Sequence, residues 1–274
     1  MSNDFKPADL RIAACKLAEL GGETARRYFG RASVSRKADD TPVTEADHAT
    51  QGAILDALAG QFPSHAILVE EEVADPDQHT KLKAADYCWV VDPIDGTRSY
   101  ARGIGVYSTS VAVLHNGEPI AGAIHDATTG KIYSAAKGSG AFVDDRPMVI
   151  EDRPINTDTT VMISSFRRRT VPDAVRRWMD RYLFRNQGSL CLHLAWVAAD
   201  LADAAYAIEC KLWDVSAGTL LVQEAGGIVT DHTGKPIWPR DISNYRDEDI
   251  PILVGSQTMH PKLLSTLVDD GLHT

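Results

Sequence analysis

The chain has 274 residues, 44% hydrophobic and 24% charged, which suits a soluble globular protein with one large core or two joined subdomains. Its formal net charge of −10 argues against a nucleic acid polymer as partner. No apolar run approaches the roughly 20 residues that span a bilayer, so no membrane partner is expected. The N-terminal stretch lacks the apolar segment of a secretory signal, which predicts a cytoplasmic location. The four cysteines have no zinc-site spacing and are expected to be reduced thiols.

The first half of the chain opens with helical patterns and continues with short strands. Apolar spacing predicts a helix over residues 7–29, and Thr44 is the candidate N-cap of a second helix. Apolar runs at 66–69 and 87–91 predict strands that end in carboxylates. Asn116-Gly117 is a strong hairpin signal between two further strands. The two strands of this hairpin are predicted at 108–115 and 120–125, and two more strands follow at 131–136 and 140–143.

A polar stretch at 151–159 has no periodicity and predicts a boundary between an N-terminal subdomain, 1–153, and a C-terminal one, 154–274. Strands are predicted beyond it at 161–164, 204–208, 228–230 and 252–255, and helices at 172–182, 191–202, 215–225 and 260–268. Helices and strands therefore mix, with hairpins in the first half. This pattern predicts a layered α/β or α+β protein.

The segment around Asp92 carries the most chemical information. An apolar strand runs directly into Asp92, which places this carboxylate at a strand's C-terminal end, where active sites of α/β proteins lie. Asp95 follows three residues later, and in a turn both carboxylates and the Ile94 carbonyl can converge on one hard cation. The amides of Gly96 and Thr97 then stand at a possible helix start suited to a phosphate. Spacing alone is equally compatible with a capped turn that carries solvated acids.

Three other acidic segments follow core-type residues. Glu70–Glu72 come directly after a predicted strand, Asp47 lies in the first turn of a predicted helix, and Asp214 stands at the start of another. Taken singly, a charged loop or helix capping explains each of them. Brought together, these carboxylates would repel one another unless metal ions neutralised them.

The acidic segments have a recognisable order along the chain. Pro42–Asp47, Ile67–Glu71, Asp92–Thr97 and Trp213–Gly218, followed by Glu224–Gly227, resemble the successive signatures of the inositol monophosphatase family. The resemblance covers nearly the whole chain. It implies an α+β fold, the layered αβαβα sandwich of the sugar-phosphatase type, commonly as a homodimer. It also implies a magnesium-dependent phosphatase that hydrolyses a small-molecule phosphate ester.

The resemblance implies a set of metal ligands. They are Glu70, Asp92, the Ile94 carbonyl, Asp95 and Asp214, which would hold two Mg²⁺ ions, with a third, weaker ion near Glu70. Asp92 would be shared between two of the ions.

The same resemblance implies the catalytic and phosphate-binding groups. Asp47, Glu70 and Thr97 form the implied catalytic set, in which the Thr97 hydroxyl contacts the attacking water and Asp47 holds that hydroxyl. Asp95 and the amides of Gly96 and Thr97 are the implied substrate and phosphate contacts. Glu71 is implied to lie next to these residues and to support them without binding the metal or the phosphate itself.

The second half is implied to set substrate choice. Gly188, Ser189 and Leu190 resemble the family's Gly-Ser/Thr-Ala segment, with Leu190 where a small alanine is usual. Ala207 stands where inositol-specific members carry a glutamate. Glu209 would share its strand face and is the expected replacement. This departure leaves strict inositol specificity open.

Several substrates and one other class of function remain open. An inositol monophosphate-like ester is expected first, then histidinol phosphate, because Asp95–Ser99 resembles histidinol-phosphate phosphatases. A sugar bisphosphate or 3′-phosphoadenosine nucleotide comes third. Arg167–Arg169 either reach a second anionic group or form a solvated basic turn, Arg98 follows the phosphate motif with its role left open, and His193 is expected to be packed. A non-catalytic regulatory homologue that binds phosphate ligands is the alternative outside enzymes, and the intact ligand set disfavours it.

Overall fold

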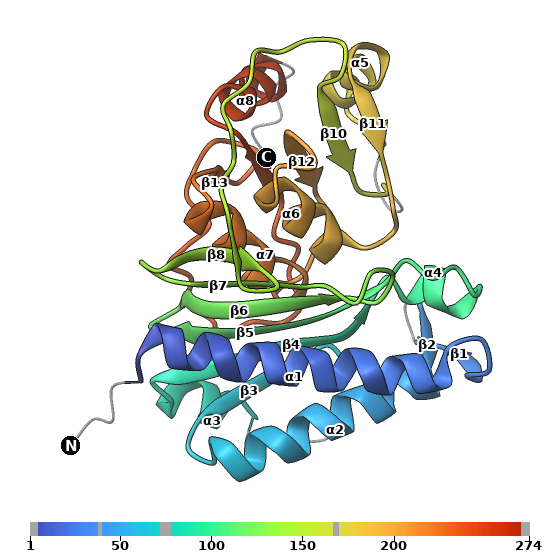
Figure 1. Cartoon of the computed structure of the whole chain (residues 1–274), viewed down its shortest axis with the longest axis vertical. Helices are drawn as coiled ribbons and strands as arrows, with labels where there is room; N and C mark the ends of the chain where they lie inside the picture. The colour runs from blue at the N-terminus through green and yellow to red at the C-terminus, as the bar shows by residue number, and fades with distance from the viewer. Residues whose placement is uncertain (1–4, 38–39, 72–77, 167–169, 270–274) are drawn as a thin grey trace.

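A computed structural model of the chain describes residues 5–37, 40–71, 78–166 and 170–269. Its main elements form five layers, in the order helices, sheet, helices, sheet, helices (Figure 1). This arrangement is the αβαβα sandwich predicted from the resemblance. Within the described residues, no helix is both long and apolar enough to cross a membrane.

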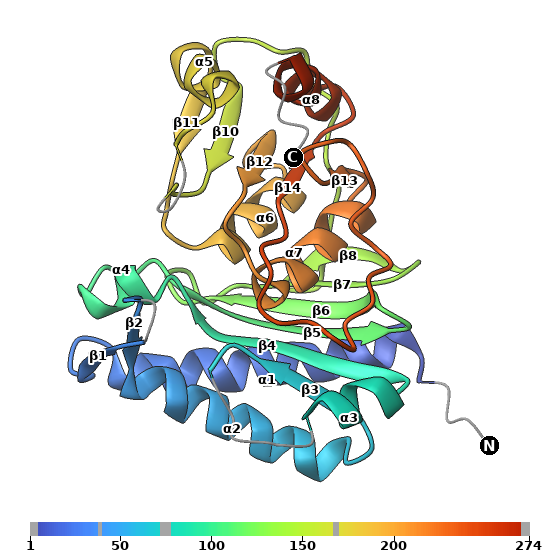
Figure 2. The same cartoon turned by 180° about the vertical axis from the view of Figure 1, so that it is seen from behind.

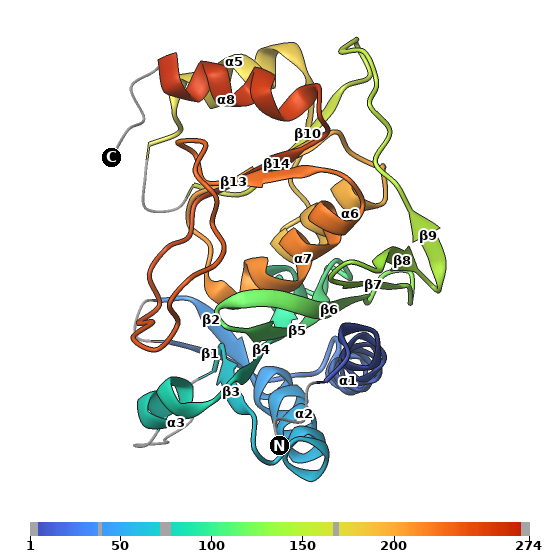
Figure 3. The same ribbon diagram turned by 90° about the vertical axis from the view of Figure 1, so that its left-hand side faces the viewer.

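The first layer is a pair of helices on the outer face of the larger sheet (Figure 3). Gly21 and Gly22 lie in the middle of the first helix, where glycine normally weakens helix formation. A Cβ atom on Gly21 would lie 2.6 Å from Thr109 Cγ2, and one on Gly22 would overlap the His125 ring. The two glycines therefore let the helix lie directly against the sheet. The helices are α1 (Pro7–Tyr28) and α2 (Glu45–Gln61).

The larger sheet has seven strands, in the order β3-β4-β5-β6-β7-β8-β9. Only β3 and β4 pair in parallel, and the other neighbours are antiparallel. The predicted hairpin at Asn116-Gly117 joins β5 to β6, and both of its residues have positive φ. The strands are β3 (Ala66–Val69), β4 (Tyr87–Asp95), β5 (Ser108–His115), β6 (Glu118–Asp126), β7 (Ile132–Ala136), β8 (Gly140–Val143) and β9 (Arg146–Met148).

Two apolar helices, α6 (Leu190–Ala198) and α7 (Leu212–Glu224), lie between the two sheets (Figure 2). Nearly every residue of both helices is buried, as expected for a helix with apolar residues on all sides. The largest cluster of buried hydrophobic residues includes Val90 of the first sheet and Val254 of the second. The two halves of the chain therefore share one core.

The smaller sheet has five strands, in the order β11-β10-β12-β14-β13, with two outer helices on its far face (Figure 3). Its strands are β10 (Thr160–Ile163), β11 (Leu183–Arg185), β12 (Ala204–Ala207), β13 (Ile228–Thr230) and β14 (Ile252–Gly255). The outer helices are α5 (Asp173–Arg181) and α8 (Met259–Asp269). Residues 149–159, which contain the predicted boundary, form neither helix nor strand.

Six short elements were not predicted as such or were only suggested by the pattern. They are β1 (Val34–Arg36), β2 (Pro42–Thr44), α3 (Gln78–Ala84), α4 (Thr97–Ala101) and the strands β9 and β11. The strands β1 and β2 form a separate two-stranded ribbon close to the C-terminal end of α1. Every residue of β1 is exposed, so this strand lacks the apolar alternation that reveals a strand in sequence.

Candidate active site

The end of β4 brings two carboxylates to one side of the sheet. Asp92 pairs with Ser110 of β5, but the register then shifts, and Asp95 pairs with Ser108. In a regular strand, residues three apart point to opposite faces. The bulge removes that alternation and re-aims the second side chain. The strand was predicted to end at Val91, and it continues through this bulge to Asp95.

A third carboxylate comes from the other half of the chain. Asp214 lies in the first turn of α7, and its Oδ2 accepts a hydrogen bond from the Lys211 amide at 2.6 Å. One carboxylate oxygen from each of Asp92, Asp95 and Asp214 fits within a cluster whose members are no more than 4.8 Å apart. The helix was predicted to begin at Val215, but it begins at Leu212, so Asp214 is the third helical residue. An acid at this position reaches back to the N-cap amide, as in a capping box.

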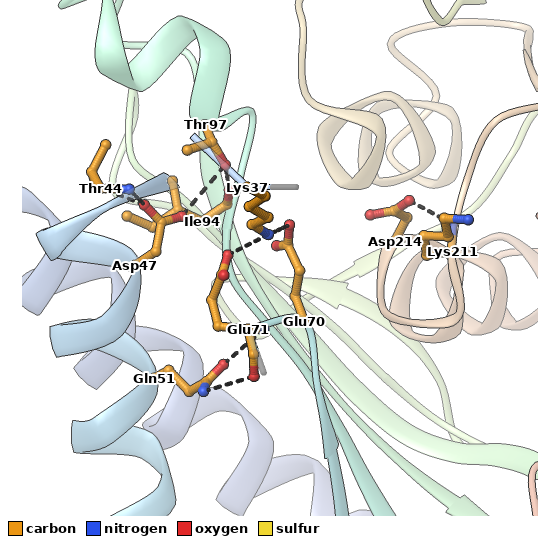
Figure 4. Close-up of polar contacts among 10 residues, drawn as sticks. All are labelled: Lys37, Thr44, Asp47, Gln51, Glu70, Glu71, Ile94, Thr97, Lys211 and Asp214. Atoms are coloured by element: carbon orange, nitrogen blue, oxygen red, sulfur yellow. Dashed lines mark hydrogen bonds and ion pairs between the residues drawn. The ribbon is translucent and has the colours of Figure 1, made fainter. Parts of the chain in front are cut away.

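Two glutamates, Glu70 and Glu71, come directly after β3, the strand that pairs with β4. The Glu70 amide donates to the Val91 carbonyl (3.2 Å) and extends the parallel pairing of β3 with β4. Gln51 of α2 makes two hydrogen bonds with the backbone of Glu71, each 3.2 Å long. Lys37, which follows β1, lies between the two glutamates, with Nζ 2.9 Å from Glu70 Oε1 and 2.6 Å from Glu71 Oε1 (Figure 4).

Asp47 and Thr97 meet beside these glutamates (Figure 4). Asp47 is fully buried, and its Oδ2 accepts hydrogen bonds from the Thr44 amide (2.8 Å) and hydroxyl (2.6 Å). This capping box at the start of α2 leaves Oδ1 facing the Thr97 hydroxyl at 3.4 Å. The Thr97 hydroxyl also lies 2.9 Å from the Ile94 carbonyl oxygen. Thr97 is the first residue of α4, which follows Gly96 in the left-handed region (φ 93°).

The carboxylates of this centre have raised pKa values. Burial, and then the charges of Glu70, Asp95 and Asp214, raise the pKa of Asp92 well above its ordinary value. Burial and then Asp95 raise the pKa of Asp214 to about 8. Burial raises the pKa of Asp95 to about 6, although the Ser189 hydroxyl opposes this shift. At neutral pH, negative charge is therefore costly here in the absence of a cation.

The centre fits a magnesium site. Hard carboxylate oxygens are the ligands that Mg²⁺ uses, and three of them converge on one point. Asp92 Oδ1 is buried and has no hydrogen-bond partner among the described residues. A buried carboxylate oxygen without a donor is costly unless a cation contacts it. Glu70 lies beside this group, since its charge is the second cause of the shift at Asp92.

The segment 188–190 lies against this centre, with only its glycine exposed. Ser189 is the N-cap of α6 and is fully buried, and its hydroxyl lies 2.6 Å from Asp95 Oδ2. Leu190 is packed in the core. Gly188 has φ 84°, and a Cβ atom there would lie 2.6 Å from Ser99 Oγ. Of the three residues implied to contact the substrate, Ser189 and Leu190 therefore have side chains that are buried in the protein.

The remaining sequence-based candidates have varied positions. β12 ends at Ala207, so Glu209 lies in the bend beyond it, and the argument that both share a strand face was wrong. Arg98 is exposed on α4. His193 is buried, as predicted, and its Nε2 accepts a hydrogen bond from the Gln187 amide at 3.0 Å. Arg167–Arg169 lie outside the described residues.

Sequence reasoning missed Lys37. The residues around Lys37 have no apolar periodicity that would predict an element there, since Lys37 follows an exposed three-residue strand. Two adjacent acids after an apolar strand, Glu70 and Glu71, are the feature that calls for a nearby cation. Burial opposes the charge of Lys37, yet Glu70 and Glu71 raise its pKa above the ordinary value. The lysine is thus held in its charged form beside the candidate metal ligands.

Two cavities lie away from the carboxylates, near the C-terminal end of α1. One, of about 560 Å³, lies between α1 and α2, and the other, of about 250 Å³, lies between the segment 30–32 that follows α1 and the end of α4. Arg31 lines both. Neither contains Asp92, Asp95 or Asp214, so the site is defined by its convergent side chains and not by cavity size.

Known proteins resemble this chain in sequence and in structure. The model of the inositol monophosphatase family matches residues 6–270. A Nus factor SuhB from Xylella fastidiosa is 30% identical over 266 residues, which cover 93% of each protein. A histidinol-phosphatase from Chlorobaculum parvum is 33% identical over 235 residues, which cover 83% of this chain and 87% of the relative.

Solved structures agree with this result. An IMPase from Thermotoga maritima has a TM-score of 0.82 and 26% identity, covering 96% of this chain and 98% of its own. The extragenic suppressor protein suhB from Bartonella henselae has a TM-score of 0.80 and 28% identity, covering 95% and 98%. Because the family match runs through nearly the whole chain and these structures share its layers, the chain belongs to the inositol monophosphatase family.

Proposed function

We propose that this chain is a magnesium-dependent phosphatase that hydrolyses a small phosphate monoester. The observation that carries the proposal is the convergence of Asp92, Asp95 and Asp214, with Thr97 and Asp47 paired beside them. The first group suits cations that offset the charge of a phosphate, and the second suits the orientation of a water molecule. Family membership supports the reaction class.

The carboxylates of Glu70, Asp92, Asp95 and Asp214, with the Ile94 carbonyl, would hold the magnesium ions. We propose two ions, with a third near Glu70. When bound, they supply positive charge that stabilises the phosphate in the transition state and makes an attacking water more acidic. Such cations would also offset the repulsion between these carboxylates and an anionic substrate.

Thr97 and Asp47 would orient the attacking water. The Thr97 hydroxyl has two acceptors within reach, Ile94 O and Asp47 Oδ1. If it donates to Asp47, its lone pairs are free to accept a hydrogen bond from water. Asp47 cannot turn away, because two hydrogen bonds from Thr44 hold its other oxygen. Thr44 thus keeps Asp47 in place as an acceptor for the Thr97 hydroxyl.

The loop that precedes α4 would hold the phosphate through the Gly96 and Thr97 amides. Gly96 has φ 93°, and its carbonyl accepts hydrogen bonds from the Ser99 and Tyr100 amides. A Cβ atom at Gly96 would lie 3.1 Å from the Gly188 carbonyl oxygen, so a larger residue would shift the loop. Gly188 itself is part of the segment that we propose to border the substrate.

We propose an inositol monophosphate-like ester as the first candidate substrate. Histidinol phosphate is the second, because a histidinol-phosphatase is 33% identical to this chain. A sugar bisphosphate or 3′-phosphoadenosine nucleotide comes third. Several relatives carry the name Nus factor SuhB, so a role outside catalysis is the remaining alternative. A cytoplasmic homodimer is part of the proposal, and sedimentation of the purified chain tests the dimer.

The test is phosphate release from four compounds with and without Mg²⁺. They are inositol 1-phosphate, histidinol phosphate, fructose 1,6-bisphosphate and 3′-phosphoadenosine 5′-phosphate. We expect release that requires Mg²⁺ and prefers one compound by about 100-fold, which corresponds to roughly 2.7 kcal/mol in transition-state binding. Magnesium binding without release from any of the four would favour the non-catalytic alternative.

A further inference from the structure

The first turn of α6 holds one oxygen of Asp95. The Ser189 hydroxyl donates to Asp95 Oδ2 at 2.6 Å, and the Cys191 amide donates to the same oxygen at 2.6 Å. Hydrogen bonds to a carboxylate are short and strong when the donors are well placed. These two donors commit Oδ2 to the protein and leave Oδ1 without either bond. Asp95 and Ser189 are 94 residues apart, so the contact is purely tertiary.

The hydrogen-bond partners of Ser189 determine which of them receives its hydroxyl proton. A hydroxyl has one proton to donate, and an ionised carboxylate only accepts, so this proton lies on the bond to Asp95. Ser189 Oγ also accepts the Leu192 amide at 3.2 Å as the N-cap of α6. The Ser108 hydroxyl, 3.1 Å away, is then the donor to Ser189. The chain from Ser108 through Ser189 to Asp95 is polarised toward the carboxylate, which strengthens it.

The same turn also contacts the element that carries Asp214. The Cys191 thiol lies 3.3 Å from the Asp214 carbonyl oxygen. Residues 189–191 thus touch one candidate ligand from the first sheet and the backbone of another from α7. The Ser189 side chain is fully buried and has no free face toward solvent.

We infer that Ser189 is a positioning residue, which fixes Asp95 for cation binding instead of contacting the substrate through its side chain. The inference rests on the proposed function, since it takes Asp95 as a magnesium ligand. Residues that hold a metal ligand typically change metal affinity by about 10-fold to 100-fold when they are replaced. A substrate contact would instead change the affinity for substrate.

The test compares Ser189→Gly with Ser189→Thr in the full chain. Glycine is accepted at the N-cap nearly as well as serine but has no hydroxyl to donate. Threonine keeps both the cap and the donor. Ser108→Ala is the matched control, because it removes a neighbouring buried hydroxyl that does not touch Asp95. Thermal unfolding of each variant without metal verifies that it folds.

Isothermal titration with MgCl₂ gives the affinity of each variant. We expect Ser189→Gly to bind about 10-fold to 100-fold more weakly, Ser189→Thr to bind as the parent does, and Ser108→Ala to lose less than Ser189→Gly. At saturating Mg²⁺, we expect the KM of Ser189→Gly for its phosphate ester to stay unchanged.

The outcomes separate this inference from the proposed function. Unchanged Mg²⁺ affinity in Ser189→Gly, an equal loss in Ser189→Thr, or a raised KM at saturating Mg²⁺ would overturn the positioning role alone. A parent chain that binds no Mg²⁺ would overturn both. Weaker Mg²⁺ binding by Ser189→Gly in a parent that hydrolyses no tested ester would uphold the positioning role while the enzymatic proposal fails.

Discussion

The ammonium group of Lys37 forms an ion pair with buried Glu71 over 2.6 Å and joins the β1–β2 ribbon to the end of β3. Glu71 is 4% exposed, and burial followed by the charge of Glu70 raises its pKa to about 7. Lys37 opposes that shift. The ion pair therefore holds in place the residue next to the candidate ligand Glu70, and it keeps positive charge beside this site.

Replacement of Lys37 should destabilise the chain through Glu71. In Lys37→Met, the buried carboxylate loses its counter-charge, and we expect a loss of about 2 kcal/mol in the free energy of unfolding. Lys37 is 26% exposed, so the cost stays below that of a fully buried pair. Urea unfolding measures it. In the double variant Lys37→Met/Glu71→Gln most of the loss should disappear, and an additive loss would show that the pair is not the cause.

Replacement of Asp92 should separate activity from stability. Asp92→Asn removes the ligand that we propose two ions to share, so turnover should fall below about a tenth of the parent value. Without metal, the same change removes a buried charge that Glu70, Asp95 and Asp214 repel, so the thermal midpoint should rise. Phosphate release and thermal unfolding in EDTA test the two effects. Asp145→Asn, at a side chain that is 88% exposed, is the control and should change neither.

The parts of the site that lie within one segment could be predicted from the sequence. The apolar run that ends at Asp92 identified β4, and Thr44 with Asp47 identified the start of α2, because strand burial and helix capping depend on local pattern. The resemblance then named Asp92, Asp95 and Asp214 as ligands, and these three side chains do converge in the structure.

The contacts that depend on tertiary structure could not be predicted. The bulge after Asp92 depends on the pairing of β4 with β5, and the bond from Ser189 to Asp95 joins residues of different layers. Lys37 follows β1, yet its ammonium group pairs with Glu71, which follows β3. Such contacts leave no periodicity in the sequence. The predicted start of α7 was wrong for another reason, since the prediction places Asp214 just before the helix, whereas this residue lies in its first turn.

The raised pKa values predict how stability without metal depends on pH. Asp214 has an ordinary pKa of 3.8 and a folded pKa of about 8, so the folded chain binds its proton more tightly than the unfolded chain does. The contribution of Asp214 to stability without metal should therefore be greatest near pH 4 and should be lost as the pH rises to roughly 8. Asp95 and Glu71 add to this trend with folded pKa values of about 6 and 7. His193 and His260, whose pKa values burial lowers from 6.5 to about 4, contribute in the opposite direction between those two values.

Thermal unfolding in EDTA and in excess MgCl₂ across this pH range measures that trend. Magnesium competes with protons for the carboxylates, so the stabilisation that it provides should grow with pH. Asp214→Asn should remove the contribution of Asp214 to the pH dependence in EDTA, because the asparagine does not titrate. If the parent and Asp214→Asn depended on pH in the same way in EDTA, the raised pKa of Asp214 would be contradicted.

Replacement of Thr97 should slow the reaction without loosening the metal. Its hydroxyl lies 3.4 Å from Asp47 Oδ1, and its proposed task is to orient water, so Thr97→Ala should lower kcat by about 100-fold or more. Thr97→Ser keeps the hydroxyl and should keep most of the rate. Isothermal titration should give the same Mg²⁺ affinity for both variants and the parent, since the ligands are other residues. A Thr97→Ala variant that binds Mg²⁺ much more weakly would instead make Thr97 part of the metal site, and its pairing with Asp47 would then serve the fold of α4 and not the water.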